Sequence, residues 1–218
     1  NATVNRTLST PSFLASGIRV GTAIDLTGPA AATAGTITIH AGDVDVSADS
    51  GKGILAFGND ITITANSVHA RGASDPTPGA TQSHAVIADS VGTGGDIYIN
   101  VGTTSAAGNN ASAVIAYSNH AGTAGAVTVI SQDAFTSGTN ALGVAGVSHL
   151  GAVSVTSGIT VTTGNLSDAV TGFSGATGNI EVSSEYAVTN GTGSRGVVGA
   201  NSGGNVTLVS GYSSTSGG

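Results

Sequence analysis

The stretch GAVSVTSGITVTTGNLSDAVTGFS, residues 151–174, contains three short alternating runs of apolar residues separated by Gly, Ser, Asn and Asp. These runs are Val153-x-Val155, Ile159-x-Val161 and Val170-x-Gly172. Apolar residues at every second position, bounded by turn-forming residues, are typical of short β-strands joined by tight turns. The stretch therefore predicts three strands and no helix.

Most of the chain repeats this unit. The units begin at Gly35, Asp60, Gly95, Gly125, Gly151, Gly178 and Gly204. The first run of each unit has branched apolar residues at alternate positions, and the third run has a branched residue followed two positions later by Ala or Gly. We expect both runs to point into a narrow core. Units of roughly 25–35 residues without a helical pattern predict an all-β, three-sided parallel β-helix of about seven to eight turns.

One segment precedes the repeat and another interrupts it. Residues 1–15 do not fit the unit, and we expect a cap, a linker or a strand donated to a neighbouring molecule. The candidate assembly residues of this segment are Val4, Leu8, Phe13 and Leu14. We assign residues 16–218 to the β-helix. Residues 72–84 contain two prolines, which do not suit a strand interior, and are expected to form a loop insertion.

The composition argues against several classes of partner. The 218 residues include only five Lys and Arg, and the net charge is −7. Nucleic acids and anionic membrane surfaces are bound through clustered cations, so we expect neither as a partner. No apolar run approaches the roughly 20 residues of a membrane helix, so we expect no membrane insertion of this segment. Cysteine is absent, which excludes disulfides and thiol chemistry within the chain.

Histidines are the first candidate metal ligands. The five are His40, His69, His84, His120 and His149. The last two each come shortly before a unit-opening glycine, so they could lie one turn apart. Because no closely spaced His pair has a nearby carboxylate, we interpret the histidines as exposed loop residues and expect no metal or cofactor site. Weak calcium binding in the loops is the exception that we leave open.

Asp43-x-Asp45 places two carboxylates on one face of a predicted strand. β-Helix enzymes that act on polysaccharides use such outward acids. General acid–base catalysis needs two groups placed around the scissile bond, and basic partners are scarce here. We interpret these residues as solvated acids and expect a protein that is not an enzyme. A polysaccharide-active enzyme is kept as the weakest alternative.

The first runs also present threonine outward at Thr36-x-Thr38 and Thr62-x-Thr64. Such arrays occur on ice-binding faces. The next unit replaces the array with Tyr98-x-Asn100, and the units after it do not restore it. We therefore interpret these threonines as ordinary outward strand residues.

The third runs predict an apolar strip along one side of the rod. If their branched residues point inward, the alternate positions form two outward columns with several large apolar side chains. The candidate interaction strip consists of Leu55, Phe57, Ile87, Ile115, Tyr117, Val147, Phe173 and Val198. Contiguous exposed apolar surface usually marks an interaction site. The alternative is that loops or the N-terminal segment cover the strip.

The units resemble the glycine-rich strand repeats of bacterial autotransporter passengers and filamentous-haemagglutinin-like adhesins. The resemblance is carried by GAVSVTSGITVTTG at 151–164, GNIEVSSEYAVTNG at 178–191 and SRGVVGANSGGNVTLVSG at 194–211. It implies a right-handed β-helix exposed at the cell surface. The secretion motif Asn-Pro-Asn and a C-terminal barrel are not seen, so we expect a passenger segment or a member exported by another route.

These observations together predict an extracellular, non-catalytic β-solenoid of the bacterial cell surface. We expect it to mediate attachment or biofilm-type contacts, through self-association or through binding to a host surface, an abiotic surface or a glycan. The main alternative is a subunit of an extracellular filament that assembles end to end, because the ends of a solenoid expose strand edges that pair with other chains.

Overall fold

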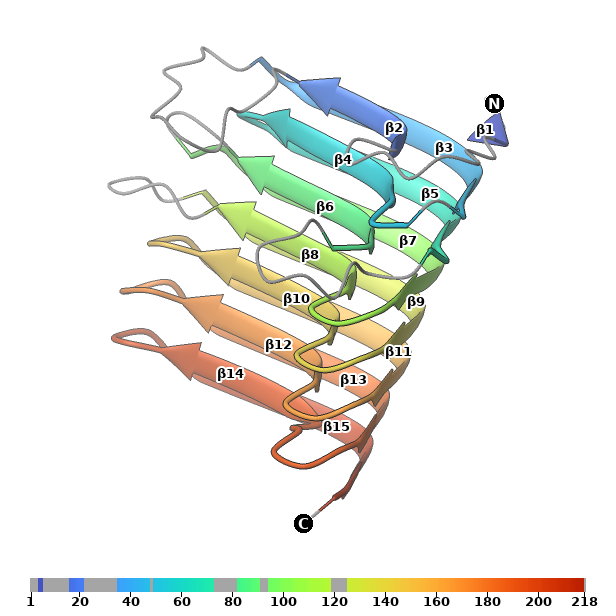
Figure 1. The fold of residues 1–218 in the computed structure, drawn as a ribbon. Helices are drawn as coiled ribbons and strands as arrows, with labels where there is room; N and C mark the ends of the chain where they lie inside the picture. Colours follow the sequence, from blue (N-terminus) through green and yellow to red (C-terminus); the bar gives the residue numbers. More distant parts are fainter. Residues whose placement is uncertain are drawn as a thin grey trace.

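The computed structural model describes residues 4–5, 16–21, 35–47, 49–72, 82–90, 94–118 and 125–217, and in this part of the chain there are strands and no helix. The strands form two parallel sheets that face each other (Figure 1). The first sheet contains β1 (Val4–Asn5), β3 (Ile37–Val46), β5 (Ile61–Ala70), β7 (Ile97–Ala107), β9 (Val127–Ser137), β11 (Val153–Thr163), β13 (Ile180–Asn190) and β15 (Val206–Ser216). The second contains β2 (Ser16–Gly21), β4 (Lys52–Gly58), β6 (His84–Ser90), β8 (Ser112–Ser118), β10 (Leu142–Ser148), β12 (Asp168–Ser174) and β14 (Val197–Asn201).

Each strand pairs with the equivalent strand of the turn before and the turn after. Val153 of β11, for example, lies opposite Val127 of β9 and Ile180 of β13. All seven units predicted from the sequence begin with a long strand of the first sheet. The predicted parallel β-solenoid is therefore confirmed. The right-handed coiling implied by the resemblance stays a prediction.

The number of strands in each turn differs from the prediction. The first and second predicted strands of each unit form one continuous strand of ten or eleven residues, so a turn has two strands instead of three. From β3 to β14 the described residues make six complete turns, and the strands outside this span add partial turns.

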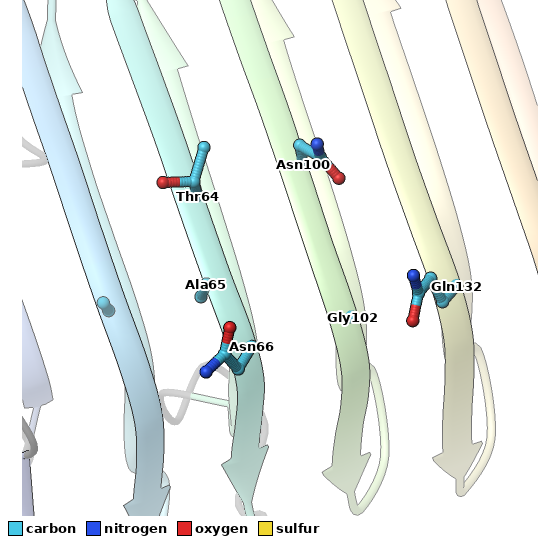
Figure 2. A pocket seen from close by; sticks show the side chains of 7 residues that line it. Thr64, Ala65, Asn66, Asn100, Gly102 and Gln132 are labelled. Atoms are coloured by element: carbon cyan, nitrogen blue, oxygen red, sulfur yellow. The ribbon is translucent and has the colours of Figure 1, made fainter.

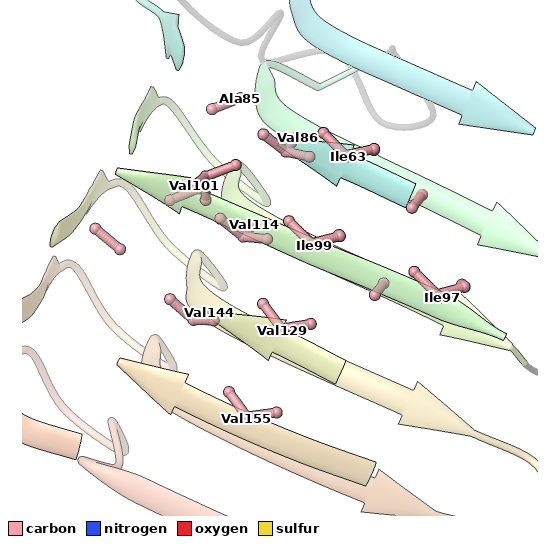
Figure 3. Close-up of a cluster of buried hydrophobic side chains, with 14 of the residues drawn as sticks. Ile63, Ala85, Val86, Ile97, Ile99, Val101, Val114, Val129, Val144 and Val155 are labelled. Carbon is pink, nitrogen blue, oxygen red and sulfur yellow. The ribbon is translucent and has the colours of Figure 1, made fainter. Parts of the chain in front are cut away.

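The core is a set of stacked columns of branched side chains (Figure 3). One column contains Ile63, Ile99, Val129 and Val155, each at most 1% exposed. The facing column of the second sheet contains Val86, Val114 and Val144, which are also buried. The alternating first and third runs thus point inward, as predicted. Ala and Gly two positions later in the third runs allow the two sheets to approach closely.

Each long strand bends near its middle, and the inward positions shift there by one residue. In β11 the buried residues are Val153, Val155 and Ser157 before the bend and Thr160 and Thr162 after it. Ile159 is consequently 44% exposed, although it begins an apolar alternating run. The extra residue at the bend acts like a bulge, which changes the face that the following side chains occupy.

Candidate functional site

The two carboxylates of Asp43-x-Asp45 lie on the outer face of β3, as predicted, and each has a partner on the next turn. Ser67 donates a 2.7 Å hydrogen bond to Asp43 Oδ1, and Arg71 Nε donates one to Asp45 Oδ1 at 3.1 Å. Both partners are on or next to β5. These acids therefore connect successive turns, which is a structural use of the pair.

Polar side chains in the connections form similar bonds between turns. Asp60 accepts the N–H of Asp96 at 3.2 Å, and Asp96 in turn accepts the N–H of Ala126 at 2.8 Å. Asn109 and Asn165 each accept a backbone N–H from the following turn. The stacking of like turns explains why acids and asparagines recur at equivalent places in the repeat.

The strongest ion pair joins Asp168 at the start of β12 to Arg195 one turn later. Arg195 donates from Nε at 3.0 Å and from Nη2 at 2.6 Å, so both carboxylate oxygens are engaged. The carboxylate hydrogen bond raises the pKa of Arg195 above its usual value. The Asp168 side chain is 9% exposed, whereas that of Arg195 is 64% exposed.

A lysine and a histidine occupy the position in earlier turns that corresponds to Asp168 and Arg195. Lys52 of β4 lies there opposite His84 of β6. Lys52 donates to the carbonyls of Ser50 and Gln82, and the backbone N–H of Ser112 donates to His84 Nδ1 at 3.1 Å. Burial lowers the pKa of Lys52 to about 8. Burial, with the nearby charge of Lys52 as a smaller cause, lowers the pKa of His84 to about 4.

The remaining histidines that the structure describes do not gather into one site. His40 Nδ1 lies 2.6 Å from the Thr64 hydroxyl, and His69 Nδ1 lies 2.7 Å from the Ser105 hydroxyl. His149 lies after β10, and His120 falls outside the described residues. Over the part of the chain that the structure describes, no group of three or more His, Asp or Glu side chains is placed to hold a metal ion.

The predicted interaction strip is aligned but only partly exposed. Its two columns are in register on the second sheet, where Ile87 lies opposite Leu55 and Ile115. The predicted exposure is wrong for Leu55 and Ile115, which are 9% and 3% exposed. The half-buried members are Phe57, Ile87, Tyr117, Val147 and Val198. Phe173 is 42% exposed and is the most exposed member of the strip.

The N-terminal assembly segment is described at one short strand. Val4 of β1 lies opposite Val44 of β3, so this residue pairs within its own chain. Leu8, Phe13 and Leu14 lie outside the described residues. The predicted insertion at 72–84 lies between β5 and β6 except for His84, which is the first residue of β6, and its residues 73–81 also lie outside the described part.

A polar hollow opens on the outer face of the first sheet, at the bend of the long strands (Figure 2). Its volume is about 400 Å³. The lining residues come from β3, β5, β7 and β9 and are Ala41, Thr64, Ala65, Asn66, Asn100, Gly102 and Gln132. Side-chain amides and a hydroxyl thus face one open space, which lies within the 300–1,000 Å³ range of typical ligand sites.

Gly102 lines the hollow without a side chain. A Cβ at this residue would lie 2.2 Å from the backbone oxygen of Asn66, so no side chain can occupy the middle turn at the bend. Asn66 and Gln132 have side chains at the bend of the turns on either side, and Figure 2 shows them flanking Gly102. The next turn again has a glycine at the bend, Gly158, where a Cβ would lie 2.3 Å from the backbone oxygen of Gln132. Residues with and without side chains therefore alternate around the hollow.

The sequence did not predict this hollow. Thr62-x-Thr64 and Tyr98-x-Asn100 lie on the outer face of the strands, as expected, but Asn66 and Gln132 were not among the candidate residues. A signal was present, because Asn66, Gly102 and Gln132 follow the first runs at equivalent positions. The bend that brings them to one surface could not be read from alternation alone.

No family model, no curated protein and no solved structure matches this chain. The fold and the bonds between turns define the class of this protein. It is a parallel β-solenoid in which polar side chains of one turn are bonded to the next turn. Among the described residues no helix is long and apolar enough to cross a membrane.

Proposed function

We propose that this chain is a bacterial cell-surface β-solenoid that acts outside the cell as structural and adhesive material, without catalysis. The observation that carries the proposal is the use of its charged groups. The ion pairs Asp45–Arg71 and Asp168–Arg195 each join one turn to the next. Charged groups used in this way stiffen a rod. The right-handed coil and the autotransporter-type or haemagglutinin-type relationship belong to the same proposal.

Exposed apolar side chains give this rod surfaces for attachment. After the bend of the first sheet, Phe135, Ile159 and Tyr186 are each 41–45% exposed and come from three successive strands. Tyr186 also stacks on Tyr212 of the next turn, with ring centroids 4.4 Å apart. Tyrosine combines an apolar ring with a polar hydroxyl, which suits contacts to wet surfaces and to other proteins.

Attachment is tested with beads coated with the purified chain. Bead adhesion to polystyrene, to immobilised mucin and to beads of the same kind is measured under flow. The triple variant Phe135→Ser, Ile159→Ser and Tyr186→Ser is compared with a polar control variant, Thr156→Ser and Ser183→Thr. We expect the triple variant to lose most of the adhesion and the control to keep it. Folded wild-type chain that adheres to none of these surfaces would refute the proposal.

The filament alternative rests on the open edge of β15. Val206 and Leu208 lie opposite the buried residues Ile180 and Val182, yet they are 42% and 48% exposed. A further turn, from the same chain or from another copy, would cover them. Electron microscopy at high protein concentration separates the two functions, because end-to-end assembly gives long fibres. Short single rods at every concentration would rule out the filament.

A further inference from the structure

We propose that the hollow at the bend of β5, β7 and β9 binds a neutral oligosaccharide, held by the amides of Asn66, Asn100 and Gln132 and by the ring of Tyr98. This inference deepens the adhesive role proposed above and rests on it for its biological setting. The binding itself is tested independently of adhesion.

The three amides have no structural task. In the part of the chain that the structure describes, the side chains of Asn66, Asn100 and Gln132 make no hydrogen bond and are exposed. Asn109 and Asn165 in the turns, by contrast, are bonded to the next turn. Three neighbouring amides that contribute nothing to the ladders between turns, yet face one hollow, are available to a ligand.

The chemistry of the lining selects a ligand without charge. None of the seven lining residues is ionisable. An amide offers two N–H donors and a carbonyl acceptor, which matches a hydroxyl group that both donates and accepts. A phosphate or an acidic sugar would instead be held by Arg or Lys, and no such residue lines the hollow.

The arrangement fits a chain of sugar residues better than a single small molecule. Asn66 and Gln132 are at equivalent positions two turns apart, about 10 Å across the strands, whereas Asn100 lies in register with Thr64, about 7 Å along the strands from them. The three amides thus mark a triangle, and its longer side across the strands is close to the length of two residues in an extended oligosaccharide. We therefore expect the ligand to run along the solenoid axis from Asn66 to Gln132, with Asn100 contacting it from the side.

Tyr98 lies outside the lining of the hollow and supplies an apolar platform beside Asn100, at one end of the site. It is 38% exposed and lies two positions before Asn100 on the same face of β7, about 7 Å along the strand. Its neighbours in register are Thr62 and Thr128, whose small side chains leave the ring accessible. The C–H face of a sugar ring packs well on an aromatic face, so the tyrosine complements the hydrogen bonds of the amides.

The test is to add oligosaccharides stepwise to the ¹⁵N-labelled chain and to monitor its side-chain NH₂ signals by NMR. The side-chain NH₂ signals are assigned with the variants Asn66→Ala, Asn100→Ala and Gln132→Ala. The probes are cellotetraose, laminaritetraose, maltotetraose and chitotetraose, with tetragalacturonate as the charged comparison. We expect at least one neutral probe to shift the three amide signals together, and we expect the charged probe to shift them less.

Calorimetry then compares the sugar affinity of each variant with that of the wild type and so shows whether binding occurs at the hollow. Each amide variant is expected to weaken binding about threefold to tenfold, which is the range for loss of one hydrogen bond. Tyr98→Ala should weaken binding and Tyr98→Phe should retain it. Asn205→Ala removes an exposed amide elsewhere, so this variant should bind like wild type.

Two results would overturn the inference. One is the absence of any shift of the three amide signals with every neutral probe, and the other is binding that the four site variants leave unchanged. Adhesion of coated beads is read separately. Loss of sugar binding with adhesion retained would mean that the hollow is not the adhesive site, whereas sugar binding without any adhesion would refute the proposed function and leave the hollow as a binding site.

Discussion

The hydroxyl of Ser148 donates a 2.8 Å hydrogen bond to the carbonyl of Gly125 and accepts one, also at 2.8 Å, from the N–H of Gly151. Gly125 opens the turn that ends with Ser148, and Gly151 opens the next. One buried side chain thus closes its own turn and fastens the following one. Equivalent serines donate to the opening residue or its neighbour in other turns, and these are Ser90, Ser118 and Ser174.

The first prediction concerns this closure. Ser148→Ala leaves a carbonyl and an N–H at the turn without their partner, and we expect a loss of about 1–3 kcal/mol in the free energy of unfolding. Urea denaturation followed by circular dichroism measures the loss. Ser154→Ala is the matched control, because within the described residues the Ser154 hydroxyl has no hydrogen bond and faces outward. Equal effects of the two substitutions would contradict the role of Ser148.

The second prediction concerns interior hydroxyls after the bend. The Oγ1 atoms of Thr136 and Thr189 are buried and have no hydrogen-bond partner among the described residues. Valine has nearly the same shape without the hydroxyl, so Thr136→Val and Thr189→Val should each stabilise the fold by about 1 kcal/mol. Thr162 lies between them in register and donates to the Ser167 carbonyl at 3.3 Å. Thr162→Val should therefore give no gain, and a gain equal to the others would count against this explanation.

Much of the fold could be predicted from the sequence, because a solenoid repeats its inward residues at a visible period. Alternation placed Ile63, Val129 and Val155 in the core correctly. Alternation also has a limit, because it does not show which of the two alternating sets of side chains in a strand points into the core. Ile159-x-Val161 aligns with Asp43-x-Asp45 on the outer face, and not with the buried Val44-x-Val46.

The candidate site depended on features that a linear pattern does not contain. The hollow requires the bend, the close approach of Gly102 to the previous turn, and the side chains of Asn66 and Gln132 on either side. The predicted strip used the correct register, yet it expected Leu55 and Ile115 to be exposed, and they are 9% and 3% exposed. Alternation assigns a residue to one face of a strand, but it does not show how much of that face is covered.

The third prediction compares the two ion pairs between turns. Arg195→Ala leaves the Asp168 carboxylate buried without its bidentate partner, and a loss of about 1–3 kcal/mol is expected, between the values for surface and buried pairs. Arg71→Ala removes the partner of Asp45, where both side chains are about half exposed or more. That loss should stay below about 1 kcal/mol. Thermal and urea denaturation of both variants measure the difference, and the reverse order of the two losses would show that burial of Asp168 is not the deciding factor.

The fourth prediction is a pH dependence of stability that comes from His84. The unfolded chain takes up a proton on this histidine near pH 6.5, whereas the folded chain does so only near pH 4, where burial has lowered the pKa. Between these values the unfolded state binds more protons, so stability falls as the pH falls, by up to about 3 kcal/mol in total. Protonation of Nδ1 would also remove the acceptor for the Ser112 N–H.

The variant His84→Gln isolates this effect, because glutamine keeps an acceptor and does not titrate. Lys52 contributes nothing to the difference in this window, since its pKa of about 8 keeps it charged in both states below pH 6.5. Urea midpoints of wild type and variant should converge or cross as the pH falls from 7 toward 4, with the wild type losing more. Parallel curves for the two proteins would mean that His84 is not the group whose protonation destabilises the fold.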